Sequence, residues 1–380
     1  MRIAYVCADR GIPFLGSKGA SVHMREMASA LAARADQVVV ACARVGAGNP
    51  PPPSVDISVL PESPRDQREH LEAILRRCRI DAVLERYSLE SETARRASAA
   101  LGLPLVLELN APLALEASRY RGLRDLDGAL ARELHSLESA DGVIVVSGRL
   151  ADYVRGRSPG AAVWVVPNGV DRAKFAGASP APLGLPEGSS AVGFVGSMKP
   201  WHGVHDLLEA FRAVAAGRPA AHLVLAGEGP EQQAIQEAAG SGALRGRVHL
   251  LGNLPHGEVP GLLASLSMAV APYPRLPDFY FSPLKVMEYL AAGLPVVYSS
   301  VGDLPDIVDG AGIGCRPGDP AGLAEAIGSL IENSGLRARL AARARERSRT
   351  FTWDAAAGRV TAVMDSLVST RREEDRCVSW

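Results

Sequence analysis

The amino-acid sequence predicts an α/β protein made of two doubly wound, Rossmann-like domains that face each other across a cleft. Apolar, β-branched runs alternate with amphipathic helical patterns along the chain, which is typical of βαβ units and parallel sheets. With 380 residues, 47% of them hydrophobic, the chain is too long for one typical core and suits two. Each half also opens alike, with a strand, a glycine-containing loop and a helix that begins near residue 21 or residue 204.

The strands are expected where short β-branched runs end at turn residues. In the first half they are expected at 2–7, 37–43, 81–85, 104–109, 142–146 and 163–166, with helices over 21–33 and 67–77. In the second half they are expected at 191–195, 222–226, 247–251, 268–271 and 295–298. A linker-like stretch rich in Gly, Pro, Ala and Ser, residues 176–190, follows the Pro-Asn-Gly turn at 167–169. We therefore place the two domains at 1–170 and 171–354.

Composition and charge narrow the class of protein. A net charge of −1 gives no reason to expect nucleic acid or an acidic membrane as the main partner. The longest weakly polar run, 261–272, is too short to span a bilayer, and the chain begins directly as a strand without the design of a signal peptide. The five cysteines are scattered, odd in number and without a CxxC motif, which favours a reducing compartment. We expect a soluble cytoplasmic protein, and we interpret the arginine-rich run at 337–349 as a solvated helix face.

Residues 279–297 carry the clearest chemical signal. They read as a loop, a short helix and a strand, with Ser282 as the N-cap, Pro283 as the first helical residue and Gly293 at the helix end. The free N–H groups of the helix N-terminus, with Lys285 nearby, form an anion site. Glu288 lies about one turn further along, where its carboxylate can accept hydrogen bonds from sugar hydroxyls. An ordinary βαβ element with a capped helix is the alternative interpretation.

The loop within residues 194–203 is a second candidate. It follows a buried strand and precedes a helix, so it faces the ligand crevice at the carboxyl end of a parallel strand. Lys199 in this loop either neutralises a diphosphate there or is a solvated loop lysine. His202 and His205 are three residues apart, but no third ligand is nearby in the sequence, so we expect no zinc site.

Residues 279–297 resemble the nucleotide-sugar site of the retaining glycosyltransferases of the GT-B fold, family 4, also called glycosyltransferase group 1. In that family a Glu, seven residues and a second Glu precede an Ala-x-Gly helix end. Here the second Glu is Glu288, whereas Tyr280 holds the first position and Asp278 is the nearest carboxylate. The resemblance covers nearly the whole chain. It implies a GT-B fold with an acceptor-side domain over 1–170, a nucleotide-sugar-binding domain over 171–354, and C-terminal helices within 355–380 that pack back on the first domain.

The resemblance also assigns roles in the second domain. The family usually has an Arg after the first Gly of the 194–203 loop and a Lys before the last Gly, where this chain has Ser197 and His202, so Lys199 is expected to supply the missing charge. The Gly-Glu-Gly-Pro turn at 227–230 is similar to a turn of the family, and the region of Asn253 holds the nucleotide base there through backbone groups. The donor-binding residues so implied are Gly16, Gly19, Ser197, His202, Glu228, Asn253, Ser282, Pro283, Leu284, Lys285 and Glu288.

In the first domain, the family uses the loop of Gly16 and Gly19 close to the donor phosphate and sugar. His23 either faces the cleft or lies on a surface turn, and Arg86 either meets the acceptor or forms a surface ion pair. Asn110 stands where many relatives have a His that contacts the transferred sugar. The expected catalytic residues are Lys199, His23 and Asn110.

The activity that the resemblance implies is retaining, metal-independent hexosyl transfer from a nucleotide diphosphate sugar to a hydroxyl or amine acceptor, without a cofactor, by a monomer or homodimer. No Asp-x-Asp motif is placed to hold a divalent metal on phosphates. A sugar-nucleotide epimerase of the same fold is one alternative, although it would need acid–base carboxylates and histidines around the sugar ring. A catalytically inactive binding protein is another, because Tyr280, Ser197 and His202 depart from the family pattern.

Overall fold

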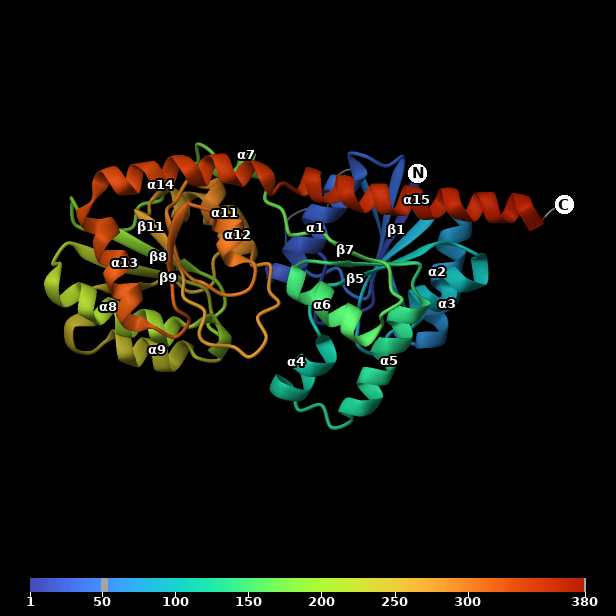
Figure 1. Cartoon of the computed structure of the whole chain (residues 1–380), viewed down its shortest axis with the longest axis horizontal. Helices are drawn as coiled ribbons and strands as arrows, with labels where there is room; N and C mark the ends of the chain where they lie inside the picture. The colour runs from blue at the N-terminus through green and yellow to red at the C-terminus, as the bar shows by residue number, and fades with distance from the viewer. Residues whose placement is uncertain (49–53, 379–380) are drawn as a thin grey trace. The chain divides into compact units, whose positions relative to one another are not determined.

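The computed structural model describes residues 1–48 and 54–378 and divides the chain into two compact units. Unit 1 comprises Met1–Asn168 together with Trp353–Trp380, and unit 2 comprises Gly169–Thr352. Both divisions fall two residues before the boundaries given above. The chain crosses between the units twice, so unit 2 is a single continuous segment, whereas unit 1 is closed by its own C-terminal helix (Figure 1).

Unit 1 is built on a seven-stranded parallel sheet in the order β3-β2-β1-β4-β5-β6-β7. The order reverses direction at β1, which lies between β2 and β4, so the carboxyl end of β1 is a topological switch point. The central strands are buried along almost their whole length because helices cover both faces of such a sheet. The strands are β1 (Arg2–Cys7), β2 (Gln37–Cys42), β3 (Val55–Val59), β4 (Ala82–Arg86), β5 (Leu105–Leu109), β6 (Gly142–Val145) and β7 (Val163–Val165).

The helices of unit 1 include α15, the long C-terminal helix. It packs on α1, where the Arg34 guanidinium donates two hydrogen bonds to Asp354, at 2.9 and 2.8 Å, and Ala357 and Met364 are fully buried. α15 therefore completes the first core. The helices are α1 (Gly19–Ala32), α2 (Pro64–Arg77), α3 (Thr93–Leu101), α4 (Leu113–Tyr120), α5 (Leu126–Ser139), α6 (Gly148–Arg157) and α15 (Trp353–Val378).

Unit 2 repeats the design with a six-stranded parallel sheet in the order β10-β9-β8-β11-β12-β13. Its switch point is β8, between β9 and β11. The strands are β8 (Ser190–Val195), β9 (Ala221–Ala226), β10 (Val248–Leu250), β11 (Met268–Ala271), β12 (Val296–Ser299) and β13 (Gly312–Cys315). The helices are α7 (Arg172–Phe175), α8 (Val204–Gly217), α9 (Gln232–Ala239), α10 (Val259–Ala264), α11 (Leu284–Ala291), α12 (Leu304–Val308), α13 (Pro320–Glu332) and α14 (Ser334–Arg347), with short 3₁₀ turns η1 (Pro200–His202), η2 (Gly242–Leu244), η3 (His256–Glu258) and η4 (Ser348–Thr350).

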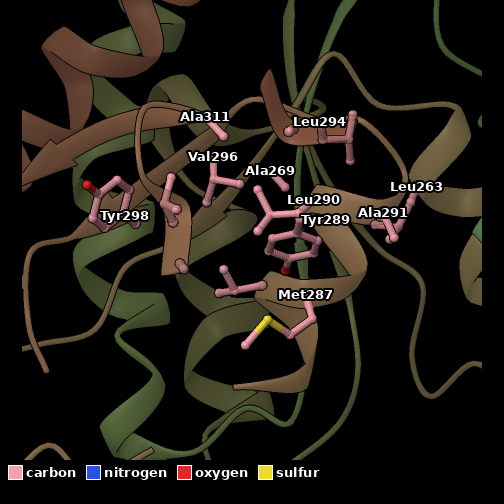
Figure 2. Packing of buried hydrophobic residues seen from close by; sticks show 14 of the residues in the cluster. Leu263, Ala269, Met287, Tyr289, Leu290, Ala291, Leu294, Val296, Tyr298 and Ala311 are labelled. Atoms are coloured by element: carbon pink, nitrogen blue, oxygen red, sulfur yellow. The ribbon is translucent and has the colours of Figure 1, made fainter. Parts of the chain in front are cut away.

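Helix α11 is anchored in the larger core of unit 2. Met287, Tyr289 and Leu290 are fully buried with strand residues such as Val296 in one cluster (Figure 2). The Tyr289 hydroxyl lies 2.8 Å from the amide nitrogen of Val195, from which it accepts a hydrogen bond. This bond fixes α11 against the carboxyl end of β8, where the sheet changes direction.

The arginine-rich run only partly matches the expectation of a solvated helix face. Arg337 donates to the carbonyl of Leu330 at 2.6 Å, Arg343 to that of Asp309 at 3.1 Å, and Arg347 to that of Ile307 at 3.1 Å. For Arg337 and Arg347, whose bonds are partly buried, the expectation is wrong, because they satisfy carbonyls at the C-terminal ends of α13 and α12, which no further helical turn can pair. The Arg343 side chain remains 39% exposed. The other arginines of the run, 339, 345 and 349, are exposed.

Candidate functional site

The helix N-terminus singled out in the sequence lies in unit 2, at the start of α11. Pro283 is the N-cap, with φ −76° and ψ 113°, and no side chain caps the helix. The expectation that Ser282 is the N-cap is therefore wrong, because Pro283 is still extended and the helix begins at Leu284. Ser282, which lies two residues before the helix, is buried. Leu284, the first helical residue, is half-buried.

Lys285 brings a buried positive charge to this helix. Its Nζ is buried without a hydrogen-bond partner among the residues that the structure describes, 4.1 Å from the ring centroid of Phe194 and 5.8 Å from that of Tyr273. Burial lowers the pKa of Lys285 from its ordinary 10.5 to about 7, with Glu288 opposing the shift. At neutral pH the amine is poised between its two protonation states.

The Lys285 amine lies against the end of β8. A Cβ added to Gly196 would lie 2.4 Å from Nζ, and Gly196 has φ +149°, a conformation that L side chains rarely adopt. The backbone at position 196 therefore favours glycine, and the absence of a side chain there leaves room for the amine beside the 196–203 loop. The two residues are 89 positions apart in the sequence, so the pairing is a product of the parallel sheet.

Two polar side chains of the 196–203 loop, those of His202 and Lys199, differ in the charge that they can offer to an anion. The His202 Nδ1–H donates to the carbonyl of Ser197, and burial together with the nearby Lys285 charge lowers the pKa of His202 to about 3. His202 is therefore neutral at pH 7 and supplies no charge to an anion. The Nζ of Lys199 lies 4.9 Å from the ring centroid of Trp201, a cation–π contact at the loop surface.

Glu288 lies one turn into α11, as expected, but it already has a protein partner. Its Oε1 accepts a hydrogen bond from the His256 Nε2–H at 2.7 Å, and both side chains are largely buried. His256 was not anticipated, because nothing in its local sequence indicates an interaction with a residue 32 positions away. Glu228 and Asn253 also lie close together: the Glu228 Oε1 accepts a hydrogen bond from the backbone N–H of Asn253 at 3.4 Å.

Tyr280 and Asp278, the two candidates for the first position of the family motif, lie in different environments. Tyr280 is 9% exposed and packs on Phe281, with ring centroids 4.4 Å apart. Asp278 is exposed.

In unit 1, His23 belongs to a buried polar cluster rather than to a surface turn. Its Nε2 lies 2.6 Å from Oε1 of Glu108, and its Nδ1 lies 2.7 Å from Oδ1 of Asn168. The Tyr5 hydroxyl donates to the other oxygen of Glu108 at 2.6 Å, and Arg86 lies 3.6 Å from that oxygen. The surface-turn interpretation of His23 and the surface ion pair of Arg86 are both wrong, because the α1 helix and the sheet bury them.

Glu108, at the carboxyl end of β5, is the centre of this cluster. Burial alone would raise its pKa, but His23 and Arg86 outweigh that effect and lower it to about 2. Glu108 is thus ionised at neutral pH. Nothing in the local sequence distinguishes Glu108 beyond its place at a strand end.

Two buried donors beside Glu108 remain unsatisfied within the described part of the chain, Arg86 Nη1 and Asn110 Nδ2. Arg86 pairs with Glu108 in the β4–β5 register, and Asn110 follows Glu108 by two residues, so they lie at the same face and edge of the sheet. The neighbouring β1–α1 loop is tightly built, since a Cβ on Gly16 would lie 2.8 Å from Pro13. Helix α1 begins at Gly19, two residues before the expected start.

Neither a metal-binding group nor a membrane-spanning helix is found among the residues described. Within 1–48 and 54–378, no group of three His, Cys, Asp or Glu side chains could hold a metal ion. His205, three residues from His202, instead pairs with Glu231 at 3.6 Å. None of the helices in that part of the chain combines the length and hydropathy needed to cross a bilayer.

Comparisons with known proteins agree with this architecture. The family model described as Glycosyltransferase Family 4 matches residues 17–174, and the one described as Glycosyl transferases group 1 matches residues 189–333. The chain is 31% identical to a glycogen synthase of Mycobacterium tuberculosis over 284 residues, which are 72% of this chain and 64% of that relative. It therefore spans less than two thirds of the relative's length.

Two solved structures share the fold over nearly the whole chain. A sucrose-phosphate synthase from Thermosynechococcus elongatus has a TM-score of 0.77 at 22% identity, covering 97% of this chain and 99% of that one. The Anabaena protein HepE, solved in complex with UDP-glucose, has a TM-score of 0.76 at 19% identity, covering 96% and 100%. Two doubly wound units of seven and six parallel strands define the GT-B class of fold. Within that class, the chain belongs to glycosyltransferase family 4, group 1.

Proposed function

We propose that the protein is a glycosyltransferase that moves a sugar from a nucleotide diphosphate donor to a hydroxyl or amine acceptor. The observation that carries the proposal is the Lys285 amine, which is buried without a hydrogen-bond partner among the described residues where β8, the switch strand of unit 2, ends. A buried cation is destabilised unless an anion pairs with it. A diphosphate in this position would provide that anion, and the N–H groups of α11 would add to its stabilisation.

The other residues of unit 2 fit the remaining parts of a nucleotide sugar. Glu288 lies one turn along the same helix and can accept hydrogen bonds from ribose hydroxyls. The loop of Asn253, held by Glu228, would contact the base. HepE, which shares the fold, was solved with UDP-glucose. We therefore assign donor binding to unit 2 and acceptor binding to unit 1, where Arg86 and Asn110 have donors to offer.

Lys285 takes the main electrostatic role in this proposal, and Lys199 assists it. Negative charge that develops on the leaving diphosphate is stabilised most by a fixed cation in a dry site. Lys285 is buried and held against Gly196, whereas Lys199 rests on Trp201. Because His202 is neutral, Lys285 is the residue that compensates for the family's missing basic side chains.

We further propose that transfer retains the anomeric configuration and requires neither metal nor cofactor. In front-face attack the departing phosphate oxygen takes the acceptor proton, so no protein base is needed near the acceptor. That suits Asn110 in place of a histidine. The charge on the phosphate would be met by Lys285 and the α11 N-terminus in place of a divalent ion.

The test is incubation of the protein with a panel of nucleotide sugars and acceptors, with and without EDTA, followed by NMR of the product. An α-linked product from an α-linked donor, formed in EDTA, is the expected result. A β-linked product would overturn retention, and activity lost in EDTA and restored by magnesium would overturn metal independence. A donor that is only epimerised, or bound without turnover, would contradict the transferase proposal itself.

A further inference from the structure

The segment of residues 251–256, which runs from the end of β10 to the first residue of η3 and is called the 251–256 loop below, is hydrogen-bonded to the rest of unit 2 at both of its ends. Near its start, the carbonyl of Gly252 accepts from the Gly227 amide at 2.7 Å, and the Asn253 amide donates to Glu228 Oε1 at 3.4 Å. At its end, His256 donates to Glu288 Oε1 at 2.7 Å. The last tie is the one that joins this loop to α11.

The His256 ring is itself held in place. Phe175 of α7, which is 4% exposed, meets the imidazole edge-on, with ring centroids 6.5 Å apart at 67°. The His256 and Glu288 side chains are 18% and 11% exposed, so water competes little for their hydrogen bond. Because the acceptor is a carboxylate, the hydrogen must sit on Nε2, and the neutral tautomer suffices.

We propose that His256 is a positioning residue for nucleotide recognition. By occupying Oε1 of Glu288, it orients the carboxylate so that Oε2 is presented to the ribose diol of a nucleoside diphosphate. By the same bond it fixes the 251–256 loop, which would lie over the base, at a set position relative to that ribose. The inference rests on the proposed function, since it assumes that a nucleoside diphosphate binds at α11.

This role predicts that different residues affect the binding of different parts of the ligand. His256 acts on the ribose and base, whereas Lys285 acts on the phosphates. Loss of His256 should therefore weaken binding of a nucleoside diphosphate but leave binding of inorganic pyrophosphate unchanged. Loss of the Lys285 charge should weaken both ligands.

The experiment is isothermal titration of the full chain with UDP, GDP, ADP, their 2′-deoxy analogues and pyrophosphate. For His256→Ala, the dissociation constant of the nucleoside diphosphate that binds wild type should rise on the order of tenfold, the scale of one hydrogen bond to a charged group. The preference for ribose over 2′-deoxyribose should fall with it. His256→Gln, whose amide N–H can still reach Glu288, should recover most of the affinity, whereas the shorter His256→Asn should not.

Two controls separate positioning from general damage. His205→Ala removes a half-exposed histidine of the same unit that pairs only weakly, at 3.6 Å, with Glu231, and it should bind like wild type. In the double variant with Glu288→Gln, the loss caused by His256→Ala should largely disappear, because the two residues act through one bond. If His256→Ala does not fold, the contrast between His256→Gln and His256→Asn carries the test.

Unchanged nucleoside diphosphate binding in His256→Ala, or an equal loss for pyrophosphate, would overturn the role of His256 while leaving the proposed function intact. If wild type binds none of the three nucleoside diphosphates nor any nucleotide sugar, the proposed function fails as well.

Discussion

A lysine amine loses hydration when it is buried, and the loss is recovered only when an anion binds it. The aromatic rings of Phe194 and Tyr273 lie against the Lys285 amine and exclude water from it. The same rings explain why its pKa falls to about 7. Its charge is therefore available to a ligand at neutral pH but is lost in mildly alkaline solution.

We predict that the affinity for a diphosphate falls as pH rises above about 7, because Lys285 is protonated below that pKa and neutral above it. Lys285→Met should abolish this pH dependence and weaken binding by roughly 10- to 100-fold at pH 6.5, the scale of one lost hydrogen bond to a charged group. Titration calorimetry with UDP from pH 6 to 9 measures both effects. Lys199→Ala is the matched control, and an equal change in its pH profile would contradict the assignment to Lys285.

Glu85, on the other face of β4 from Arg86, gives a second prediction at the residue scale. Its Oε1 is buried without a partner in the described chain, and burial raises its pKa to about 8, with Arg95 opposing the shift only partly. Because the pKa of Glu85 is higher in the folded state than in the unfolded state, its ionisation lowers the free energy of unfolding as pH rises between about 4.5 and 8.

Glu85→Gln should therefore be close to neutral at pH 5 and should stabilise unit 1 at pH 9, by up to a few kcal/mol in order of magnitude. Urea unfolding of wild type and variant at the two pH values provides the comparison. A difference between variant and wild type that does not grow with pH would show that Glu85 is not ionised unfavourably in the folded state.

At the scale of an element, the β8–α8 connection shows how tightly the site is built. Gly203 ends η1 with φ +69°, and a Cβ there would lie 1.7 Å from the carbonyl oxygen of Pro272. The loop that begins beside Lys285 is therefore pressed against the segment that follows β11. Its conformation depends on a glycine at the point where the two meet.

Gly203→Ala is predicted to destabilise unit 2 by roughly 2–4 kcal/mol, since the new methyl combines an unfavourable φ with a backbone clash. Gly217, in the last turn of α8, is the matched control because a Cβ there meets nothing within 4 Å. Gly217→Ala should be neutral or stabilising by up to about 1 kcal/mol. Chemical denaturation of both variants tests the pair, and similar stabilities would refute the steric argument.

At the scale of the whole molecule, the two units differ in how they are closed. Unit 2 is continuous from Gly169 to Thr352, and the backbone of Val170 pairs with that of the segment just before Thr352. Unit 1 needs α15 to cover α1, where Trp353 and Met364 are buried. Deleting the C-terminal helix should therefore harm only one of the two units.

We predict that a segment of residues 169–352 folds alone and binds pyrophosphate in a manner that depends on Lys285. Residues 1–168 without α15 should be unstable, because the apolar face of α1 would be exposed. Circular dichroism melting of the two segments, with calorimetry on the first, measures this. An unfolded 169–352 segment would mean that the second core relies on the first.

Most of the strands and the glycine loops that follow them were predictable because local chemistry specifies them, whereas the strand order was not. Buried parallel strands read as β-branched runs, and the glycines at their ends mark the loops. Two edge strands, β3 and β13, were not predicted because neither is a continuous β-branched run. In β3, Asp56 and Ser58 interrupt the apolar pattern, and β13 carries Gly312 and Gly314. Partners in three dimensions, rather than composition, make these segments strands.

The same distinction applies to the candidate site: some of its residues could be named from the sequence, but their contacts could not. That a lysine and a glutamate lie about one turn apart on a helix after a strand follows from spacing alone, so Lys285 and Glu288 could be named from the sequence. Which atoms they meet could not. The contact of Lys285 with Gly196, the His256–Glu288 bond and the Glu108 cluster each join residues dozens of positions apart. Such contacts arise when parallel strands bring their carboxyl ends to one edge, so burial, and with it the pKa of Lys285, is set by packing.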